Sequence, residues 1–495
     1  MDLRSFLKEY EARYPEDVLH IEKEISGNQE ITALVIQLQK QQKFPVLVFH
    51  NVLNPTGKKS SHPVITNVLA SRVRQARLCG CTVEGLGRHV YEATLSRRVA
   101  PVAVPKTDAP VREVIKTADD IDLFHFPLIW HNALDAGYYL SAGFFTSYEP
   151  ESGIDNCALL RTWIKEKDTV RVFLVPRPMH SAWNLHKHEQ KGQDMKACIW
   201  LGHHPLAYMG GLAKLAYPES HWEAIGGMMG EPLRLVSSES LGDDFKVPAD
   251  AEVVIEGIME ANRRYPEGPF GENPGYYGGQ ILNPQLRVTA VTHRKDAMWY
   301  NIAAGYADHQ QSGAPNVEGQ LWAALKPRFA TLVNVHVPLS ATGRYAAYLQ
   351  FKNPLPGEAR LAIMLACTAR THIKHVFAFD EDVDIFDERD VMWAITTRSQ
   401  WDRDVMIFPH TKSVPLDPST TPPALGATGG IDCTKPWGEP YEERVGIEQE
   451  VAARVKLEDY VSPEDLGRLT QDRSRLVRSP GASSNGGNHA GLPLR

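Results

Sequence analysis

Apolar residues in the first part of the chain recur in both helical and strand-like patterns. They follow helical spacing in residues 5–15 and 33–42, whereas residues 44–52 form the short apolar run of a buried strand. Gly80 closes a third helix-like segment, because Gly readily adopts the conformation in which helices end. These patterns predict an N-terminal α/β segment over residues 1–115.

The next part, residues 116–320, consists mainly of short strand-like runs separated by polar turns. Segment 157–178 predicts two strands around the polar turn 165–168. Further strand-like runs occupy residues 230–240, 251–260 and 286–305, with a helix expected over 219–230 and a loop over 306–316. Short strands with polar turns between them favour a split, barrel-like and mainly antiparallel sheet.

Strand-like and helix-like patterns alternate again in residues 321–472. Helices are expected over residues 319–329, 358–370, 388–400 and 462–473, and strands over 330–338 and 373–384. Alternation of this kind is typical of an open α/β sheet and predicts a C-terminal α/β domain. The Ser-, Gly- and Asn-rich tail, 473–495, is expected to be disordered. The fold class that follows is α/β (α+β).

Composition and charge exclude several classes of protein. The 495 residues carry a net charge of −7, so we expect no nucleic-acid partner. The longest apolar runs are too short to cross a bilayer, and the N-terminus lacks the apolar segment of a signal peptide, so we expect no membrane partner and a cytoplasmic location. The six cysteines form no CxxC pair, which indicates a reducing compartment rather than a disulfide or zinc framework.

Two carboxylates stand out in the segment PEGPFGENPGYYGG. Glu267 and Glu272 lie five residues apart in a run of Gly, Pro and aromatic residues, which opposes both a helix and a regular strand. A turn stiffened by Pro269 could direct both carboxylates into one cavity, where burial would suit one of them to proton transfer. A solvent-exposed turn is the alternative reading.

Several cationic and metal-binding candidates accompany this pair. Arg161 interrupts an apolar, strand-like run and needs an anionic partner, either a structural carboxylate or the carboxylate of a substrate. Lys352 follows another apolar run, and it is either a phosphate ligand or a solvated residue at the end of a strand. Histidines are frequent between His180 and Glu223, without HExxH spacing, so a metal site and structural histidines both remain open. The dinucleotide, P-loop and hydrolase-elbow motifs are absent.

In order and spacing, five segments resemble the UbiD family of reversible decarboxylases, which use prenylated FMN. They are DNCALLR, PMH, GEPLRLV, EGPFGENPGYYGG and VDIFDERDVMWAITTR, and the resemblance extends over about residues 1–470. It implies an N-terminal α/β segment, a split β-barrel that binds the flavin, and a C-terminal α/β domain that helps form a homodimer. It also implies that a flavin prenyltransferase supplies the cofactor.

The resemblance further implies roles for individual residues. Arg161, Glu267 and Glu272 match the family's Glu-Arg-Glu network, with Glu272 as the proton donor to the carbon that loses CO2. Asn156 and His180 match two ligands of a Mn2+ ion that bridges to the cofactor phosphate, with K+ beside it. Lys352 matches a lysine near that phosphate. The remaining residues expected to contact the flavin are Ala158, Leu159, Leu160 and Met179.

One position departs from the family pattern. Where the family has a glutamate as its third metal ligand, this chain has His221, and Glu223 follows two residues later, so either could be the ligand. Within the family the chain resembles the heteroaromatic branch, which implies pyrrole-2-carboxylate as substrate or another aromatic or α,β-unsaturated acid. Asn273, His309 and Asn316 are the candidates for the substrate pocket.

Three other functions compete with this hypothesis. A metal-dependent hydrolase built on His180 and Glu223 would act with a metal alone. An FMN oxidoreductase would show ordinary flavin redox cycling. A non-enzymatic oligomeric scaffold would not need Glu272.

Overall fold

The computed structural model describes residues 1–174, 179–370, 372–422 and 424–468. The chain forms one large compact unit, residues 1–39 with 43–434, and a small second unit that contains residues 435–495. The tail expected to be disordered, 473–495, lies outside the described residues, as do the end of segment 157–178 and the end of the helix expected over 462–473. In the second unit the described helices are α11 (Gln449–Arg454) and α12 (Pro463–Arg468).

The N-terminal part folds as a small α/β layer, as predicted. Its four-stranded sheet has the order β1-β3-β5-β22, with β1 (Val18–Ile21), β3 (Val46–Phe49), β5 (Val64–Thr66) and β22 (Trp299–Tyr300). β22 belongs to a much later part of the sequence, so the chain returns to this layer after the central sheet. The helices of this part are α1 (Leu3–Arg13), α2 (Glu30–Lys40), α3 (Arg72–Cys79) and α4 (Leu86–Tyr91). α3 ends at Gly80, whose left-handed φ of 62° explains the Gly at that position.

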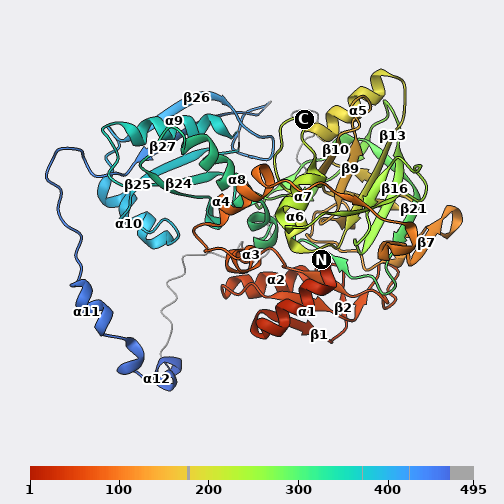
Figure 1. Cartoon of the computed structure of the whole chain (residues 1–495), viewed down its shortest axis with the longest axis horizontal. Helices are drawn as coiled ribbons and strands as arrows, with labels where there is room; N and C mark the ends of the chain where they lie inside the picture. Colours follow the sequence, from red (N-terminus) through yellow and green to blue (C-terminus); the bar gives the residue numbers. More distant parts are fainter. Residues whose placement is uncertain (175–178, 371, 423, 469–495) are drawn as a thin grey trace, which may run out of the picture. The chain divides into compact units, whose positions relative to one another are not determined.

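The middle of the sequence forms a nine-stranded antiparallel sheet, called the central sheet here. Strands β9, β10, β13, β16 and β21 of this sheet are labelled in Figure 1. Its path is β10-β9-β13-β16-β21-β12-β11-β8, and β7 pairs with β21 outside this path. The strands are β7 (Val114–Thr117), β8 (Tyr139–Leu140), β9 (Phe144–Tyr148), β10 (Asp155–Leu159), β11 (Thr162–Glu166), β12 (Thr169–Val172), β13 (Met195–Leu201), β16 (Val253–Met259) and β21 (Gln285–His293). The predicted strand pair around the 165–168 turn is β11 with β12.

The central sheet must curl, and the reason is visible in the chain path. β10 is one edge of the sheet and β11 lies next to the other edge, yet Leu160 and Arg161 alone connect them. Leu160 N also donates to Gly143 O at 3.3 Å, between β8 and β9. The two ends of the sheet are therefore drawn together at Arg161, which gives the half-closed barrel that the sequence predicted.

Both faces of the curled sheet are buried, which explains its apolar strands. Along β13, Cys198 and Trp200 join one hydrophobic core, whereas Ala197, Ile199 and Leu201 join another. Successive strand residues point to opposite faces, so a strand between two cores is apolar throughout.

The helices of this region are α5 (His180–Gln190), α6 (Pro205–Gly211) and α7 (His221–Met229). Its small sheets contain β6 (Val102–Ala103), β14 (Arg234–Ser237), β15 (Lys246–Pro248), β17 (Tyr265–Glu267), β18 (Phe270–Gly271), β19 (Tyr277–Gly278) and β20 (Ile281–Asn283).

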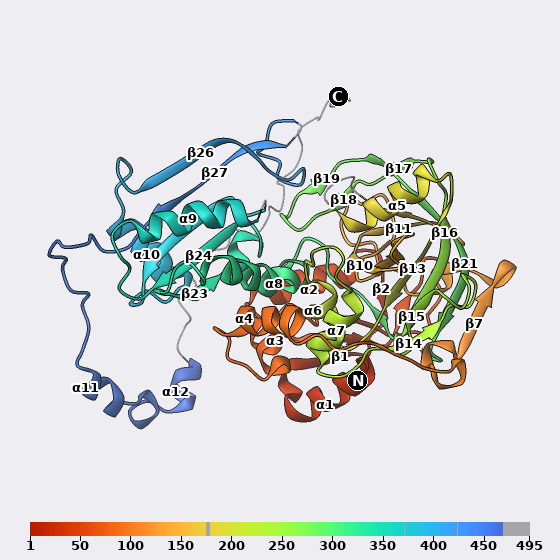
Figure 2. The same cartoon turned by 45° about the horizontal axis from the view of Figure 1, so that its top comes forward.

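The C-terminal part contains a five-stranded mixed sheet of order β23-β24-β25-β27-β26 (Figure 2). Its strands are β23 (Leu332–His336), β24 (Ala346–Phe351), β25 (His375–Asp380), β26 (Val405–Lys412) and β27 (Leu425–Asp432), with helices α9 (Glu358–Ala369) and α10 (Glu388–Arg398). On β24, Ala347 and Leu349 pack in the core that contains α9, and Ala346 and Tyr348 in the core that contains α10. The two helices therefore cover opposite faces of the sheet.

The loop expected over residues 306–316 is wrong, because this segment is the first half of helix α8 (Ala307–Leu325). Pro315 is unusual inside a helix, since Pro lacks the N–H that a helix interior uses. The carbonyl of Gln311, four residues before Pro315, accepts a hydrogen bond from Gln75 Nε2 at 3.3 Å. A side chain from the N-terminal part thus replaces the missing helical donor.

The fold class is confirmed: an N-terminal α/β layer, a central curled antiparallel sheet and a C-terminal α/β sheet. Among the described residues, no helix is both long and apolar enough to cross a membrane.

Candidate active site

Three of the candidate residues meet in one buried ion network. Arg161 Nε and Nη2 donate to the two carboxylate oxygens of Glu267 at 3.0 and 2.7 Å. Arg161 Nη1 donates to Glu272 Oε1. The residues are 7%, 0% and 7% exposed, in the order Arg161, Glu267 and Glu272. The solvent-exposed turn is therefore excluded for the glutamate pair, and in the described part of the chain these two carboxylates are the anionic partners of Arg161.

The local sequence explains how the two glutamates converge. Glu267 ends β17 and Glu272 follows β18, and these short strands pair with β20 and β19 to fold the segment back on itself. Glu272 N donates to Tyr276 O at 2.8 Å, which closes the turn. Gly278 faces the network: a Cβ there would lie 2.8 Å from Arg161 Nη1 and 3.3 Å from Glu272 Cγ. Glycine is needed at this position so that the guanidinium can reach Glu272.

The two carboxylates have different surroundings. Glu267 also accepts from Tyr139 Oη and Asn283 Nδ2, both at 3.0 Å, so four donor atoms contact its two oxygens. Burial raises the pKa of Glu272, although Arg161 opposes the shift. The guanidinium carries one positive charge against two carboxyl groups, and burial favours a proton on Glu272. A buried carboxyl group with a raised pKa is suited to acid/base chemistry.

Arg161 itself stays charged. Burial acts against its charge, but Glu272 and Glu267 together raise the pKa of the guanidinium above its ordinary value. Its Cζ also lies 3.9 Å from the ring centroid of Phe173, an arrangement that favours a cation. The site therefore holds a fixed positive charge beside a protonatable carboxyl group.

The candidate metal ligands come from three neighbouring elements. Asn156 lies on β10, His180 starts α5 and His221 starts α7. Asn156 Oδ1 accepts from Ser181 Oγ at 2.6 Å. His221 Nε2 donates to Ala213 O at 3.3 Å, which leaves Nδ1 with its lone pair, buried and without a hydrogen-bond partner. An orphaned buried nitrogen of this kind fits a metal ligand.

Both imidazoles are neutral near pH 7, as a metal requires. Burial, followed by Lys214, lowers the pKa of His221 to about 3, and His180 contributes to the same shift. Burial and Lys214 also lower the pKa of His180. Glu223 is two residues after His221 on α7, about 200° around the helix axis, so it points away from the face that His221 presents. The described ranges contain no cluster of three or more His, Cys, Asp or Glu side chains suited to a metal, so two histidines and Asn156 would need ligands from a bound group or water.

Sequence reasoning missed a cationic cluster, defined here as Lys214, Arg344 and Arg370, which lies beside the neutral imidazole of His372. Lys214 is an exposed residue, but loss of hydration around its ammonium group, followed by Arg370 and Arg344, lowers its pKa to about 8. Burial and then these three cations lower the pKa of the neighbouring His372 to about 3. Cations gathered in this way attract an anion such as phosphate. The cluster joins parts of the sequence more than a hundred residues apart, which spacing cannot reveal.

Lys352 does not belong to this cluster. Its side chain is 61% exposed at the end of β24, and Nζ lies 2.9 Å from Glu381 Oε2. The structure therefore supports the solvated strand end rather than the phosphate ligand.

The three substrate-pocket candidates lie on or beside α8. Asn273 Nδ2 donates to His309 O at 3.3 Å, and Gln310 Nε2 donates to Asn273 O at 3.0 Å. His309 and Asn316 are seven residues apart on the helix and share a face. Asn316 Nδ2 donates to Met209 O at 3.1 Å, and Asn316 lines a small cavity together with Lys214.

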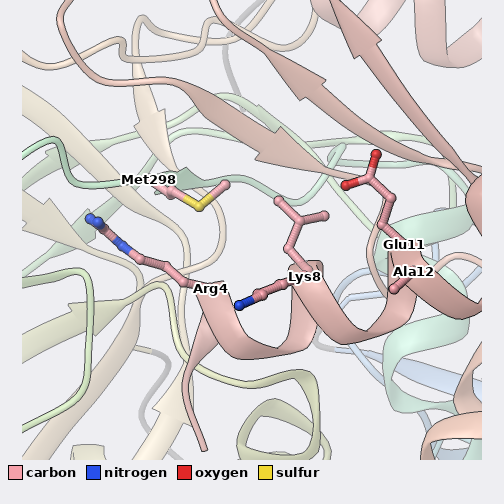
Figure 3. A pocket seen from close by; sticks show the side chains of 6 residues that line it. Arg4, Lys8, Glu11, Ala12 and Met298 are labelled. Atoms are coloured by element: carbon pink, nitrogen blue, oxygen red, sulfur yellow. The ribbon is translucent and has the colours of Figure 1, made fainter.

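Ala158, Leu159 and Leu160 precede Arg161 on and after β10, and Met179 precedes His180, so all four lie beside the candidate site in the chain. A separate surface hollow of about 470 Å³ lies along α1 (Figure 3). Arg4, Leu7, Lys8, Glu11, Ala12 and Met298 line it, and these residues are not among the candidates.

Comparisons with known proteins agree with this architecture. The N-terminal, Rift-related and C-terminal domain models of 3-octaprenyl-4-hydroxybenzoate carboxy-lyase (UbiD) match residues 11–94, 102–307 and 311–433. A phenolic acid decarboxylase of Sedimentibacter hydroxybenzoicus is 30% identical over 88% of this chain and 92% of its own length.

Two solved structures are similar over nearly the whole chain. The UbiD-class enzyme HmfF of Pelotomaculum thermopropionicum, in complex with FMN, is 31% identical with a TM-score of 0.86 and covers 93% of this chain and 100% of its own. An evolved dimeric form of HmfF, in complex with prenylated FMN, is 30% identical with a TM-score of 0.83 over the same shares.

The chain belongs to the UbiD family. These relationships make it a carboxy-lyase, that is, a decarboxylase.

Proposed function

We propose that this enzyme is a prenylated-FMN-dependent, reversible decarboxylase whose substrate is pyrrole-2-carboxylate. The observation that carries the proposal is the buried network in which Arg161 binds both Glu267 and Glu272, with the proton favoured on Glu272. HmfF, which is similar over nearly the whole chain, has been solved with FMN and with prenylated FMN.

Removal of CO2 from an aromatic ring leaves an electron pair on a ring carbon. When bound, prenylated FMN supplies the electron sink for that pair. Arg161 orients the substrate carboxylate with its fixed positive charge. After CO2 leaves, protonated Glu272 delivers its proton to the ring carbon, and the resulting carboxylate is stabilised by Arg161. In the reverse direction Glu272 removes that proton, and bicarbonate supplies the CO2.

Residues around the network are suited to hold the cofactor. Asn156, His180 and His221 would hold a Mn2+ ion, with K+ as a second cation of the site, because the orphaned Nδ1 of His221 fits a metal ligand. Lys214 and Arg370 of the cationic cluster would attract the phosphate. Ala158, Leu159, Leu160 and Met179 would line the flavin. A flavin prenyltransferase supplies the cofactor, and the enzyme acts as a homodimer in the cytoplasm.

Asn316 supports the choice of a pyrrole ring. Because its Nδ2 donates to Met209 O, its Oδ1 is oriented as an acceptor, which complements the N–H of pyrrole but not the oxygen of furan. The hydrolase hypothesis loses its basis, since Glu223 points away from the face of α7 that carries His221.

The proposal is tested on protein co-produced with a flavin prenyltransferase. We expect CO2 release from pyrrole-2-carboxylate at least about 10-fold faster than from furan-2-carboxylate, which offers no donor to Asn316. The Glu272→Gln variant should retain the flavin chromophore but lose about 10²–10⁴-fold in turnover, the usual contribution of a general acid. Undiminished CO2 release from Glu272→Gln, or no prenylated flavin in the purified wild type, would contradict the proposal.

A further inference from the structure

A second segment is hydrogen-bonded to the turn that carries Glu272. Loop 132–136 precedes β8, and it runs against the backbone of residues 269–277. Asp135 is the centre of this contact: Oδ1 accepts from Gly271 N at 2.7 Å and Oδ2 accepts from Asn132 N at 2.9 Å. The side chain is 4% exposed. One carboxylate therefore joins the loop to the residue immediately before Glu272.

Further hydrogen bonds connect the loop to the turn on both sides of Gly271. Ala136 N donates to Pro269 O at 2.8 Å, two residues before Gly271. Leu134 N donates to Tyr277 Oη at 3.2 Å, on the opposite strand of the β18–β19 hairpin. The approach is close enough that a Cβ on Gly271 would collide with Asn132 Nδ2. The loop thus fixes the turn on both strands.

We propose that Asp135 is a positioning residue, which holds the Gly271 backbone so that the carboxyl group of Glu272 meets Arg161 and the substrate carbon. The inference rests on the proposed role of Glu272. Its basis is the covalent path: Gly271 N is held by Asp135, and Glu272, the next residue, carries the acid. A small displacement of a reacting group costs about 10²-fold in rate, so loss of a hydrogen bond this close to the acid should lower kcat.

Asp135 has the electrostatic character that this role needs. Burial raises its pKa to about 6, whereas the amides of Gly271 and Asn132 and the charge of Arg161 oppose the shift. Above pH 6 the carboxylate is ionised, and both of its oxygens accept amide hydrogens. An amide side chain cannot do this, because its NH2 group would face one of the two N–H donors.

The test compares Asp135→Asn with Glu256→Gln in the full-length enzyme loaded with cofactor. Glu256 is the matched control because it is also a fully buried carboxylate that accepts hydrogen bonds from two backbone amides, Glu239 N at 2.8 Å and Ser240 N at 2.7 Å. The loop that carries these two amides lies outside the candidate site. For Asp135→Asn we expect kcat to fall about 10–100-fold while KM changes less than about two-fold, because substrate binding does not require the acid. For Glu256→Gln we expect the kcat of the wild type.

Hydrogen exchange followed by mass spectrometry provides a readout that is independent of turnover. Asp135→Asn should accelerate exchange in the peptide around Gly271 by about 10-fold or more, and Glu256→Gln should accelerate exchange around residues 238–241 instead. Unchanged exchange at Gly271 would overturn the inference, as would faster exchange with a wild-type kcat.

Two further outcomes are also decisive. If the wild type shows no decarboxylation, the proposed function fails, and exchange at Gly271 still decides whether Asp135 fixes the turn. If Asp135→Asn does not fold, Tyr277→Phe tests the same contact, because it removes the acceptor of Leu134 N at a residue that is 41% exposed. We then expect a smaller acceleration of exchange in the same peptide, and its absence would overturn the inference.

Discussion

Replacing Glu267 by Gln tests the electrostatic logic of the network. The substitution keeps the size of the side chain but removes one of the two negative charges on Arg161. With Glu267 neutral, Glu272 becomes the remaining carboxylate in contact with the guanidinium. We therefore expect Glu272 to lose its proton more readily and to become a poorer acid at neutral pH.

The geometry gives the size of this effect. Two carboxylates bound to one guanidinium lie about 5 Å apart, and at an effective dielectric constant of about 20 their repulsion is about 3 kcal/mol, or roughly 2 pKa units. Burial is the main cause of the raised pKa of Glu272, and Glu267 is a lesser one. We therefore expect the pKa of Glu272 to fall by about 1 unit, half of the bare Coulomb value.

The assay is the pH dependence of kcat for CO2 release. A general acid works in its protonated form, so the rate falls as pH rises through its pKa, and a lower pKa moves that decline to lower pH. Glu267→Gln should shift the alkaline limb down by about 1 pH unit and lower kcat about 10-fold on the limb. Tyr139→Phe is the control: it removes one hydrogen bond to Glu267 but keeps both charges, so the limb should stay within about 0.5 unit.

Folding and flavin content are checked by circular dichroism and absorbance before the comparison. A folded, flavin-loaded Glu267→Gln enzyme whose alkaline limb coincides with that of the wild type would refute the reasoning. It would mean that the charge of Glu267 does not govern the proton on Glu272.

Two further substitutions have matched controls within the chain. Gly278→Ala places a methyl group 2.8 Å from Arg161 Nη1 and should lower kcat about 100-fold or more. Gly279→Ala is the control: no neighbouring atom lies within 4 Å of the new Cβ, so this variant should keep the wild-type kcat. Equal kcat values for the two variants would contradict the close approach of Gly278 to Arg161. His221→Ala should lower the Mn2+ content of the purified enzyme at least about 10-fold, measured by elemental analysis, because it removes a ligand nitrogen. Glu223→Ala should keep its metal, and the reverse result would make Glu223 the ligand.

The parts of the fold that could be predicted from sequence are those set by local pattern. Apolar spacing and Gly80 located α3, and strand-like runs around a polar turn located β11 and β12, because burial of one face imposes its period on the sequence. For Arg161, the cost of an unpaired buried charge required an anionic partner, and the structure supplies two. The rule identified the need, but spacing alone did not identify the carboxylates.

The features that escaped prediction are long-range. The cationic cluster gathers residues from three separate segments, so no window of sequence contains it. Lys352 had the right residue type after an apolar run, but an ion pair with Glu381 holds it at the surface. Spacing in the sequence allowed either His221 or Glu223 as the third metal ligand. The two side chains point in different directions because both lie on helix α7.

Helix α8 shows why a local rule failed where the site is built. Gly313 and Pro315 are unfavourable in an isolated helix, and the missing donor at Pro315 is replaced by Gln75, far away in sequence. In the first turn of the same helix, Asp308 accepts hydrogen bonds from the backbone amides of Asn67 and Leu69 at 2.9 Å each. Contacts with the N-terminal layer therefore stabilise the helix that presents His309 and Asn316. A segment expected to be a loop is a helix because the rest of the chain completes its hydrogen bonds, and this dependence links the positions of His309 and Asn316, the proposed pocket residues, to the N-terminal layer.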